Sequence, residues 1–123
     1  MSGVLIDTSV WINHLRKSDP KLVELLGSGL VRRHPMVEGE LSLGNFKNKN
    51  IFLKEYSQLK EVPLATHQEA MIFSERNSLA GLGIGWIDAH LLASCALGSA
   101  KLYSADLSLA KAAEKVGIAE ISL

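Results

Sequence analysis

VLIDTSVW, at residues 4–11, is a short apolar run that meets the carboxylate of Asp7 and then continues with apolar residues at helical spacing. A short apolar run bounded by polar residues is typical of a buried strand, and the spacing of Val10, Trp11 and Leu15 predicts a helix. We therefore expect a strand at residues 4–6, a helix directly after it, and a carboxylate where the two meet.

The same alternation of strand and helix continues along the chain. Asp19 and Pro20 are signals for the start of a helix, and glycines follow several of the apolar periodic segments, where they end helices. Further strands are expected at residues 30–33, 62–64, 101–104 and 118–123, with helices at residues 20–26, 35–43, 51–59, 66–79, 86–97 and 107–116. Because strands that alternate with helices pair in parallel through right-handed crossovers, the prediction is an α/β fold with a central parallel sheet of four or five strands flanked by helices.

Length and composition limit the class of protein. A chain of 123 residues has the size of one domain, and 47% hydrophobic residues are enough to build a core. Thirteen basic residues balance thirteen acidic ones, which argues against a protein that coats nucleic acid through overall positive charge. The one cysteine, Cys95, allows no disulfide framework, and no segment is typical of a signal peptide or a membrane span. We expect a single cytoplasmic domain over residues 1–123 with no membrane contact.

Three of the four aspartates share one kind of position. Asp7 follows the first expected strand, Asp106 follows the strand at 101–104, and Asp88 lies in the first turn of the helix that begins near residue 86, whereas Asp19 is an ordinary helix cap. The carboxyl ends of parallel strands and the starts of the following helices lie at one edge of a sheet, so these carboxylates are expected to converge. Each of them alone could equally be a helix N-terminal carboxylate that stabilises the helix dipole.

Converging carboxylates require a compensating positive charge. Two carboxylates ~4 Å apart repel by on the order of 4 kcal/mol at an effective dielectric of about 20. Because the chain has no cysteine cluster and no histidine pair at ligand spacing, oxygen ligands would select Mg²⁺ or Mn²⁺ rather than zinc, and such ions most often serve phosphate chemistry.

A fourth acid comes from the helix that follows Pro35. Glu38 and Glu40 are two positions apart and point in nearly opposite directions on a helix, so only one of them can face the cluster. Glu40 is favoured because Leu41 and Gly44 follow it, and Glu38 is then a solvated surface charge.

Four motifs in series resemble one known family. Residues 5–12 (LIDTSVWI) look like the opening of the PIN-domain nucleases, and more narrowly of the VapC-like toxins of bacterial toxin–antitoxin pairs. The family's second motif is matched by His34-Pro35 with residues 39–45. Its third motif is matched by residues 83–90 (GIGWIDAH), and its fourth by residues 102–106 (LYSAD). The resemblance covers nearly the whole chain.

The resemblance implies a doubly wound α/β fold and a divalent-metal-dependent endoribonuclease that acts on RNA. It further implies inhibition by a cognate antitoxin protein, and either a homodimer or a toxin–antitoxin hetero-oligomer. The family's acidic positions, which are both catalytic and metal-binding, match Asp7, Glu40, Asp88 and Asp106, and Ser104 stands as a further catalytic residue where the family more often has threonine. The hypothesis is that Asp7 and Asp88 hold Mg²⁺ directly, with Mn²⁺ as a possible substitute, and that Asp106 and Glu40 act through water or a second ion.

Secondary roles are assigned to residues near these motifs. Thr8 and Ser9 are interpreted as caps of the first helix, and His90 as a satisfied core or surface histidine. Trp11 and Trp86 are interpreted as packing residues, with Trp86 the better candidate for stacking on a base.

A local excess of positive charge could dock RNA. Residues 31–60 hold six lysines and arginines, Arg32 and Arg33 among them, against three glutamates, a local balance of +3. Solvated helix faces would explain these cations equally well.

Two other classes of protein match the positions of these acidic residues less well. An aspartate-nucleophile phosphatase of the haloacid-dehalogenase type needs a second acid two residues after the first, where this chain has Ser9. A receiver domain needs adjacent early acids, and Asp7 stands alone. The remaining alternative is a catalytically silent PIN-like module that binds RNA or protein.

Overall fold

A four-stranded parallel sheet forms the centre of the computed structural model, which describes residues 3–121. Its strands are β1 (Val4–Ile6), β2 (Val31–Arg33), β3 (Lys60–Glu61) and β4 (Lys101–Tyr103), in the order β3-β2-β1-β4, and every pairing is parallel. The predicted α/β class with a parallel sheet is therefore confirmed.

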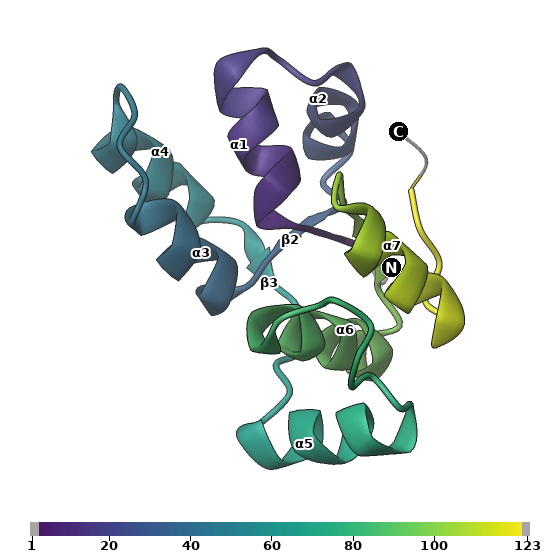
Figure 1. Ribbon diagram of the computed structural model, residues 1–123. Coiled ribbons are helices and arrows are strands. Elements are labelled where there is room, and N and C mark those ends of the chain that lie inside the picture. The colour runs from purple at the N-terminus through teal and green to yellow at the C-terminus, as the bar shows by residue number, and fades with distance from the viewer. Residues whose placement is uncertain (1–2, 122–123) are drawn as a thin grey trace.

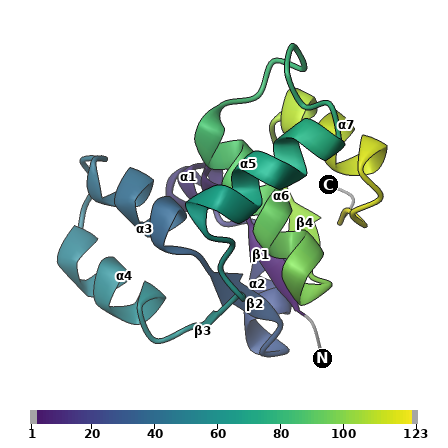
Figure 2. The same cartoon turned by 90° about the horizontal axis from the view of Figure 1, so that it is seen from below.

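Seven helices surround the sheet in the described part of the chain: α1 (Thr8–Arg16), α2 (Pro20–Gly27), α3 (Pro35–Ser42), α4 (Lys49–Tyr56), α5 (His67–Arg76), α6 (Trp86–Gly98) and α7 (Leu107–Lys115). Figure 1 shows α1, α3, α6 and α7 gathered around the centre of the molecule. Both Figure 1 and Figure 2 place α5 on the outside of α6, and α4 beside α3. Among residues 3–121, no helix has the length and apolar character that crossing a membrane requires.

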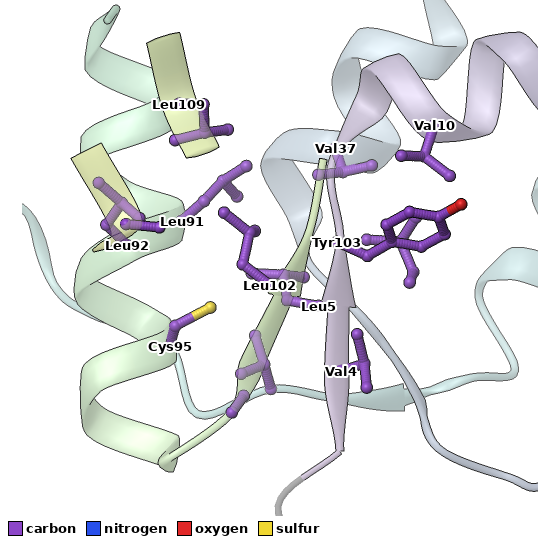
Figure 3. Packing of buried hydrophobic residues seen from close by; sticks show 14 of the residues in the cluster. Val4, Leu5, Val10, Val37, Leu91, Leu92, Cys95, Leu102, Tyr103 and Leu109 are labelled. Atoms are coloured by element: carbon purple, nitrogen blue, oxygen red, sulfur yellow. The ribbon is translucent and has the colours of Figure 1, made fainter. Parts of the chain in front are cut away.

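The core lies on both faces of β1 and β4. Leu102 of β4 points toward Leu91 and Leu92 of α6, whereas the neighbouring Tyr103 points to the opposite face, where Val10 of α1 lies (Figure 3). This is the alternation that a strand imposes on successive side chains. Helix α6 is buried at every position from Ala89 to Cys95, as expected for a central helix that is apolar on most sides.

Most predicted elements form close to their expected bounds, and helix starts follow the capping signals. Asp19 accepts hydrogen bonds from the backbone N–H groups of Lys21 and Leu22 at the start of α2. Thr66 and Glu69 form the reciprocal capping box of α5. The predicted helix over residues 66–79 ends early, at Arg76, because Ser78 adopts a left-handed backbone conformation with φ of 52°.

Both edges of the sheet differ from the prediction. The strand expected at residues 62–64 forms instead at Lys60–Glu61, and the Val62 N–H donates to the Arg33 carbonyl just before Pro63, a residue that is confined to edge strands. At the other edge, residues 119–121 pair with Leu102 as an isolated parallel bridge centred on Glu120. Residues 122 and 123 of the expected last strand lie outside the described residues.

The order of the strands determines where on the sheet a ligand would bind. From β1 the chain moves to β2 and β3 on one side, and β4 later returns to the other side of β1. In a parallel sheet, ligands bind outside the carboxyl ends of the strands at such a reversal of order. Because Ile6 pairs with Tyr103, the residues that follow them, Asp7 and Ser104, emerge side by side at that point.

Candidate active site

Asp7 lies at the centre of the polar edge. Its side chain is buried, with 6% exposure, and its backbone N–H donates to the Tyr103 carbonyl at 2.9 Å, which extends the β1–β4 pairing by one residue. The Asp7 Oδ2 atom accepts hydrogen bonds from Ser9 Oγ at 2.6 Å and from Ser104 Oγ at 2.9 Å. None of the hydrogen bonds seen within residues 3–121 reaches Asp7 Oδ1, which leaves that oxygen available to a ligand.

The two hydroxyls that bind Asp7 also hold the turn between β4 and α7. Ser9 Oγ accepts from the Ala105 N–H at 3.1 Å, and Ser104 Oγ accepts from the Asp106 N–H at 3.0 Å. Asp106 is the N-cap of α7, and its Oδ1 accepts from two backbone N–H groups of the first turn. Asp7 and Asp106 are therefore connected through two serines and held at the same edge.

Asp88 reaches this edge from the first turn of α6. Its Oδ2 accepts from the Gly85 N–H at 3.1 Å, which fixes the side chain against its own helix start. Burial raises the pKa of Asp88, and the negative charges of Asp7, Asp106 and Glu40 raise it further, against the opposing effect of the Gly85 hydrogen bond. The structure thus brings four acids from distant parts of the chain within range of one another's charge.

Of the two glutamates on α3, Glu40 belongs to this group. Its Oε1 accepts a hydrogen bond of 2.6 Å from Thr8 Oγ1, next to Asp7 in the chain. Glu38 faces elsewhere and acts on the buried hydroxyl of Tyr56, whose pKa rises mainly through burial and in part through the Glu38 charge. Of the two glutamates, Glu40 is therefore the one that lies beside the other acids, as the sequence favoured.

The donor set fits a hard divalent cation. The groups at this edge are carboxylate and hydroxyl oxygens, which Mg²⁺ and Mn²⁺ prefer. As placed, no three histidine, cysteine or acidic side chains of residues 3–121 are close enough together to enclose one ion. The acids fit such a cation by chemistry and by location at one edge.

Two interpretations of residues near the motifs are wrong. Thr8 and Ser9 do not cap α1, because the N-cap is Asp7 and both hydroxyls bind carboxylates instead. His90 is buried, as expected of a core histidine, but its Nδ1 is not satisfied by any partner among the described residues.

The two tryptophans differ in exposure. Trp11 is 2% exposed and packs edge-on against Phe52 and Tyr56, which confirms its packing role. Trp86 is 40% exposed and lies edge-on to His90, with 4.7 Å between ring centroids.

The two arginines of β2 bind other groups of the protein. Arg32 is 6% exposed, and its Nη1 donates to the Gly29 carbonyl at 3.0 Å. Arg33 pairs with Glu61 across β2 and β3 at 2.8 Å. Arg32 is therefore not exposed for phosphate binding, whereas the lysines of residues 31–60 are more exposed.

His34 is a buried structural residue. It is 3% exposed, and its Nδ1 accepts from the Met36 N–H at 3.1 Å, so the imidazole caps α3. Its Nε2 lies 3.2 Å from Ser94 Oγ on α6. The His-Pro pair at a helix start was the available signal, because proline in the first turn marks the residue before it as the cap.

A parallel sheet with acids at the carboxyl ends of its central strands is shared by several classes of α/β proteins, PIN-domain nucleases among them. The family model described as the PIN domain matches residues 4–115, so the chain belongs to the PIN-domain family. The chain is also similar to Ribonuclease VapC32 of Mycobacterium tuberculosis (strain CDC 1551 / Oshkosh), with 44% identity over 117 residues, which cover 94% of each protein. The protein of the same name from a second strain of that organism gives the same values.

Proposed function

We propose that this protein is a metal-dependent endoribonuclease and the toxin component of a toxin–antitoxin pair. The observation that carries the proposal is the convergence of Asp7, Glu40, Asp88 and Asp106 on one edge of a PIN-domain sheet. The similarity to Ribonuclease VapC32, which extends over nearly the full length of both chains, supports RNA as the substrate and an antitoxin as the natural inhibitor.

The four acids would hold Mg²⁺, with Mn²⁺ as a possible substitute. When bound, such a cation offsets the negative charge of a phosphodiester and makes water a stronger nucleophile. Asp7 contributes its free Oδ1, while its Oδ2 stays fixed by the hydroxyls of Ser9 and Ser104. Ser104 therefore acts by orienting Asp7 and by holding the backbone of Asp106.

A groove beside Glu40 supports the proposed inhibition by an antitoxin. It lies between α1 and the end of α3 and is lined by Ile12, Leu15, Arg16, Glu40 and Phe46 among others. Ile12 and Leu15 expose 41% and 36% of their surface, which a partner's apolar side chains would cover. A segment bound in this groove would lie next to the acids and block access of RNA to them.

The proposal also covers the oligomeric state of the protein and its location in the cell. The toxin acts as a homodimer or, with its antitoxin, as a hetero-oligomer, and it meets its RNA in the cytoplasm. Size-exclusion chromatography with light scattering, with and without the antitoxin, measures the assembly.

Cleavage of a mixed RNA pool by the purified protein, freed of antitoxin, tests the proposed function. Fragments are expected with Mg²⁺ or Mn²⁺, and they should disappear with EDTA and in Asp7→Asn. Glu114→Gln, which removes an exposed carboxylate at the far end of α7, is the matched control and should cut like the wild type. Intact RNA in every sample, from protein that binds no divalent cation, would favour a silent module that binds RNA or protein without cutting it.

A further inference from the structure

The two hydroxyl residues that follow Asp7 have no capping role in the helix that they begin. Thr8 and Ser9 occupy the first turn of α1, where hydroxyls commonly bond to nearby backbone groups. Here Thr8 Oγ1 donates to Glu40 Oε1, 32 residues away, and Ser9 Oγ donates to Asp7 Oδ2, each at 2.6 Å. Both bonds are short and end on a carboxylate, as charge-assisted hydrogen bonds do.

Thr8 restrains a glutamate that would otherwise move freely. The Thr8 side chain is only 8% exposed and is set at the junction of β1 and α1, whereas Glu40 is exposed on α3. An exposed glutamate samples many rotamers in water, and a hydrogen bond from a buried, fixed donor selects one of them. The Thr8–Glu40 bond therefore determines where this carboxylate lies relative to Asp7.

Ser9 performs the equivalent role for Asp7 and ties it to the neighbouring strand end. Its Oγ accepts from the Ala105 N–H at 3.1 Å while it donates to Asp7 Oδ2, so one atom joins the β1–α1 junction to the β4–α7 turn. Ser9 and Ser104 both donate hydrogen bonds to Oδ2, and these bonds fix the rotation of the Asp7 carboxylate. No donor among residues 3–121 bonds to Oδ1.

We propose that Thr8 and Ser9 are positioning residues of the metal site, with Thr8 orienting Glu40 and Ser9 orienting Asp7 to receive the divalent cation. This inference rests on the proposed function. Four carboxylates at one edge repel one another and would turn outward into water. The hydroxyl donors oppose that movement for Glu40 and Asp7, so these two carboxylates keep a fixed orientation before the cation binds. Groups that orient metal ligands in this way typically contribute 10–100-fold to metal affinity or activity.

Substitutions at Thr8 separate the hydroxyl from the packing. Thr8→Val keeps the shape and removes the donor, whereas Thr8→Ser keeps the donor. Mn²⁺ binding to the full chain, freed of antitoxin, is measured by isothermal titration calorimetry for wild type and both variants. We expect Thr8→Val to bind Mn²⁺ about tenfold more weakly and Thr8→Ser to stay within about twofold of wild type.

The metal dependence of RNA cleavage gives a second measurement. A positioning role predicts that Thr8→Val needs about tenfold more Mn²⁺ for half-maximal cleavage and recovers much of the wild-type rate at saturation. Ser9→Ala should show the same shift through Asp7, and it provides a test even if Thr8→Val does not fold. Thermal unfolding in EDTA checks that each variant is folded before metal is added.

The possible outcomes distinguish this inference from the proposed function. Wild-type Mn²⁺ affinity in both Thr8→Val and Ser9→Ala, in a protein that binds Mn²⁺ and cuts RNA, would overturn the positioning role and leave the ribonuclease intact. Equal weakening of Mn²⁺ binding in Thr8→Ser and Thr8→Val would also overturn it, because packing and not the hydroxyl would then be responsible. If the wild type itself bound no divalent cation, both proposals would fail.

Discussion

Acidification should destabilise this protein through His34. Burial, together with the charge of His90, lowers the pKa of His34 from its ordinary value of 6.5 to about 4. The lowering has a structural basis, because Nδ1 accepts the Met36 N–H and the other ring nitrogen then carries the hydrogen that meets Ser94 Oγ. A proton on Nδ1 would remove the cap of α3 and place a charge in the core.

The difference in the pKa of His34 between the unfolded and the folded chain sets how the free energy of unfolding changes with pH. Between pH 6.5 and about pH 4 the unfolded chain takes up a proton at His34 that the folded protein does not, so the free energy of unfolding falls as the pH falls. Each pH unit contributes at most ~1.4 kcal/mol. Across the interval the loss approaches ~3 kcal/mol, a large part of the stability of a small domain.

Urea denaturation in EDTA at several pH values between 7 and 4 measures this loss. His34→Asn is the matched control, because asparagine is a good N-cap and has no titrating ring. The wild type should lose ~3 kcal/mol more than His34→Asn over the interval. If the two proteins lost stability in parallel, the imidazole would not be the group responsible and the reasoning would be refuted.

Three further predictions concern single side chains. Tyr103→Phe removes the 2.6 Å hydrogen bond from Tyr103 to Asp19 Oδ2 and should cost ~1.5 kcal/mol in urea denaturation; an unchanged midpoint would contradict it. Asp88→Asn removes a carboxylate whose pKa is raised by burial and by its acidic neighbours, so it should raise the melting temperature in EDTA while abolishing RNA cleavage. A lower melting temperature would show that these acids do not repel one another. Thr66→Ala breaks the capping box with Glu69 and should cost ~1 kcal/mol, whereas Thr66→Ser should cost little in the same denaturation assay.

Local patterns were sufficient to predict parallel pairing of the strands and a common edge for the aspartates, but not the order of the strands. The apolar run before Asp7 and the alternation of strands and helices imply a parallel sheet, and a parallel sheet puts Asp7, Asp88 and Asp106 at one edge. Helix starts at Asp19 and Thr66 were predictable because capping depends on residues within one turn.

Contacts between distant residues could not be predicted in this way. Nothing in the periodicity of α1 shows that Thr8 bonds to a glutamate 32 residues away, and the local pattern predicts a cap instead. Arg32 has the sequence signature of an exposed cation, but tertiary packing buries it against the Gly29 carbonyl. Helical spacing separates Glu38 from Glu40 but does not fix the rotation of α3, which packs against both α1 and α4.

Cleavage rates of single and paired amide variants test most directly whether the acids form one site. Asp7→Asn, Asp88→Asn and the double variant would be compared on one RNA substrate at saturating Mn²⁺. Each single variant should lose most of the cleavage rate, and the double variant should be little worse than either, because residues that act as a unit are not additive. Substantial cleavage by either single variant, or losses that multiply in the double variant, would contradict a shared metal site at the ends of β1 and α6.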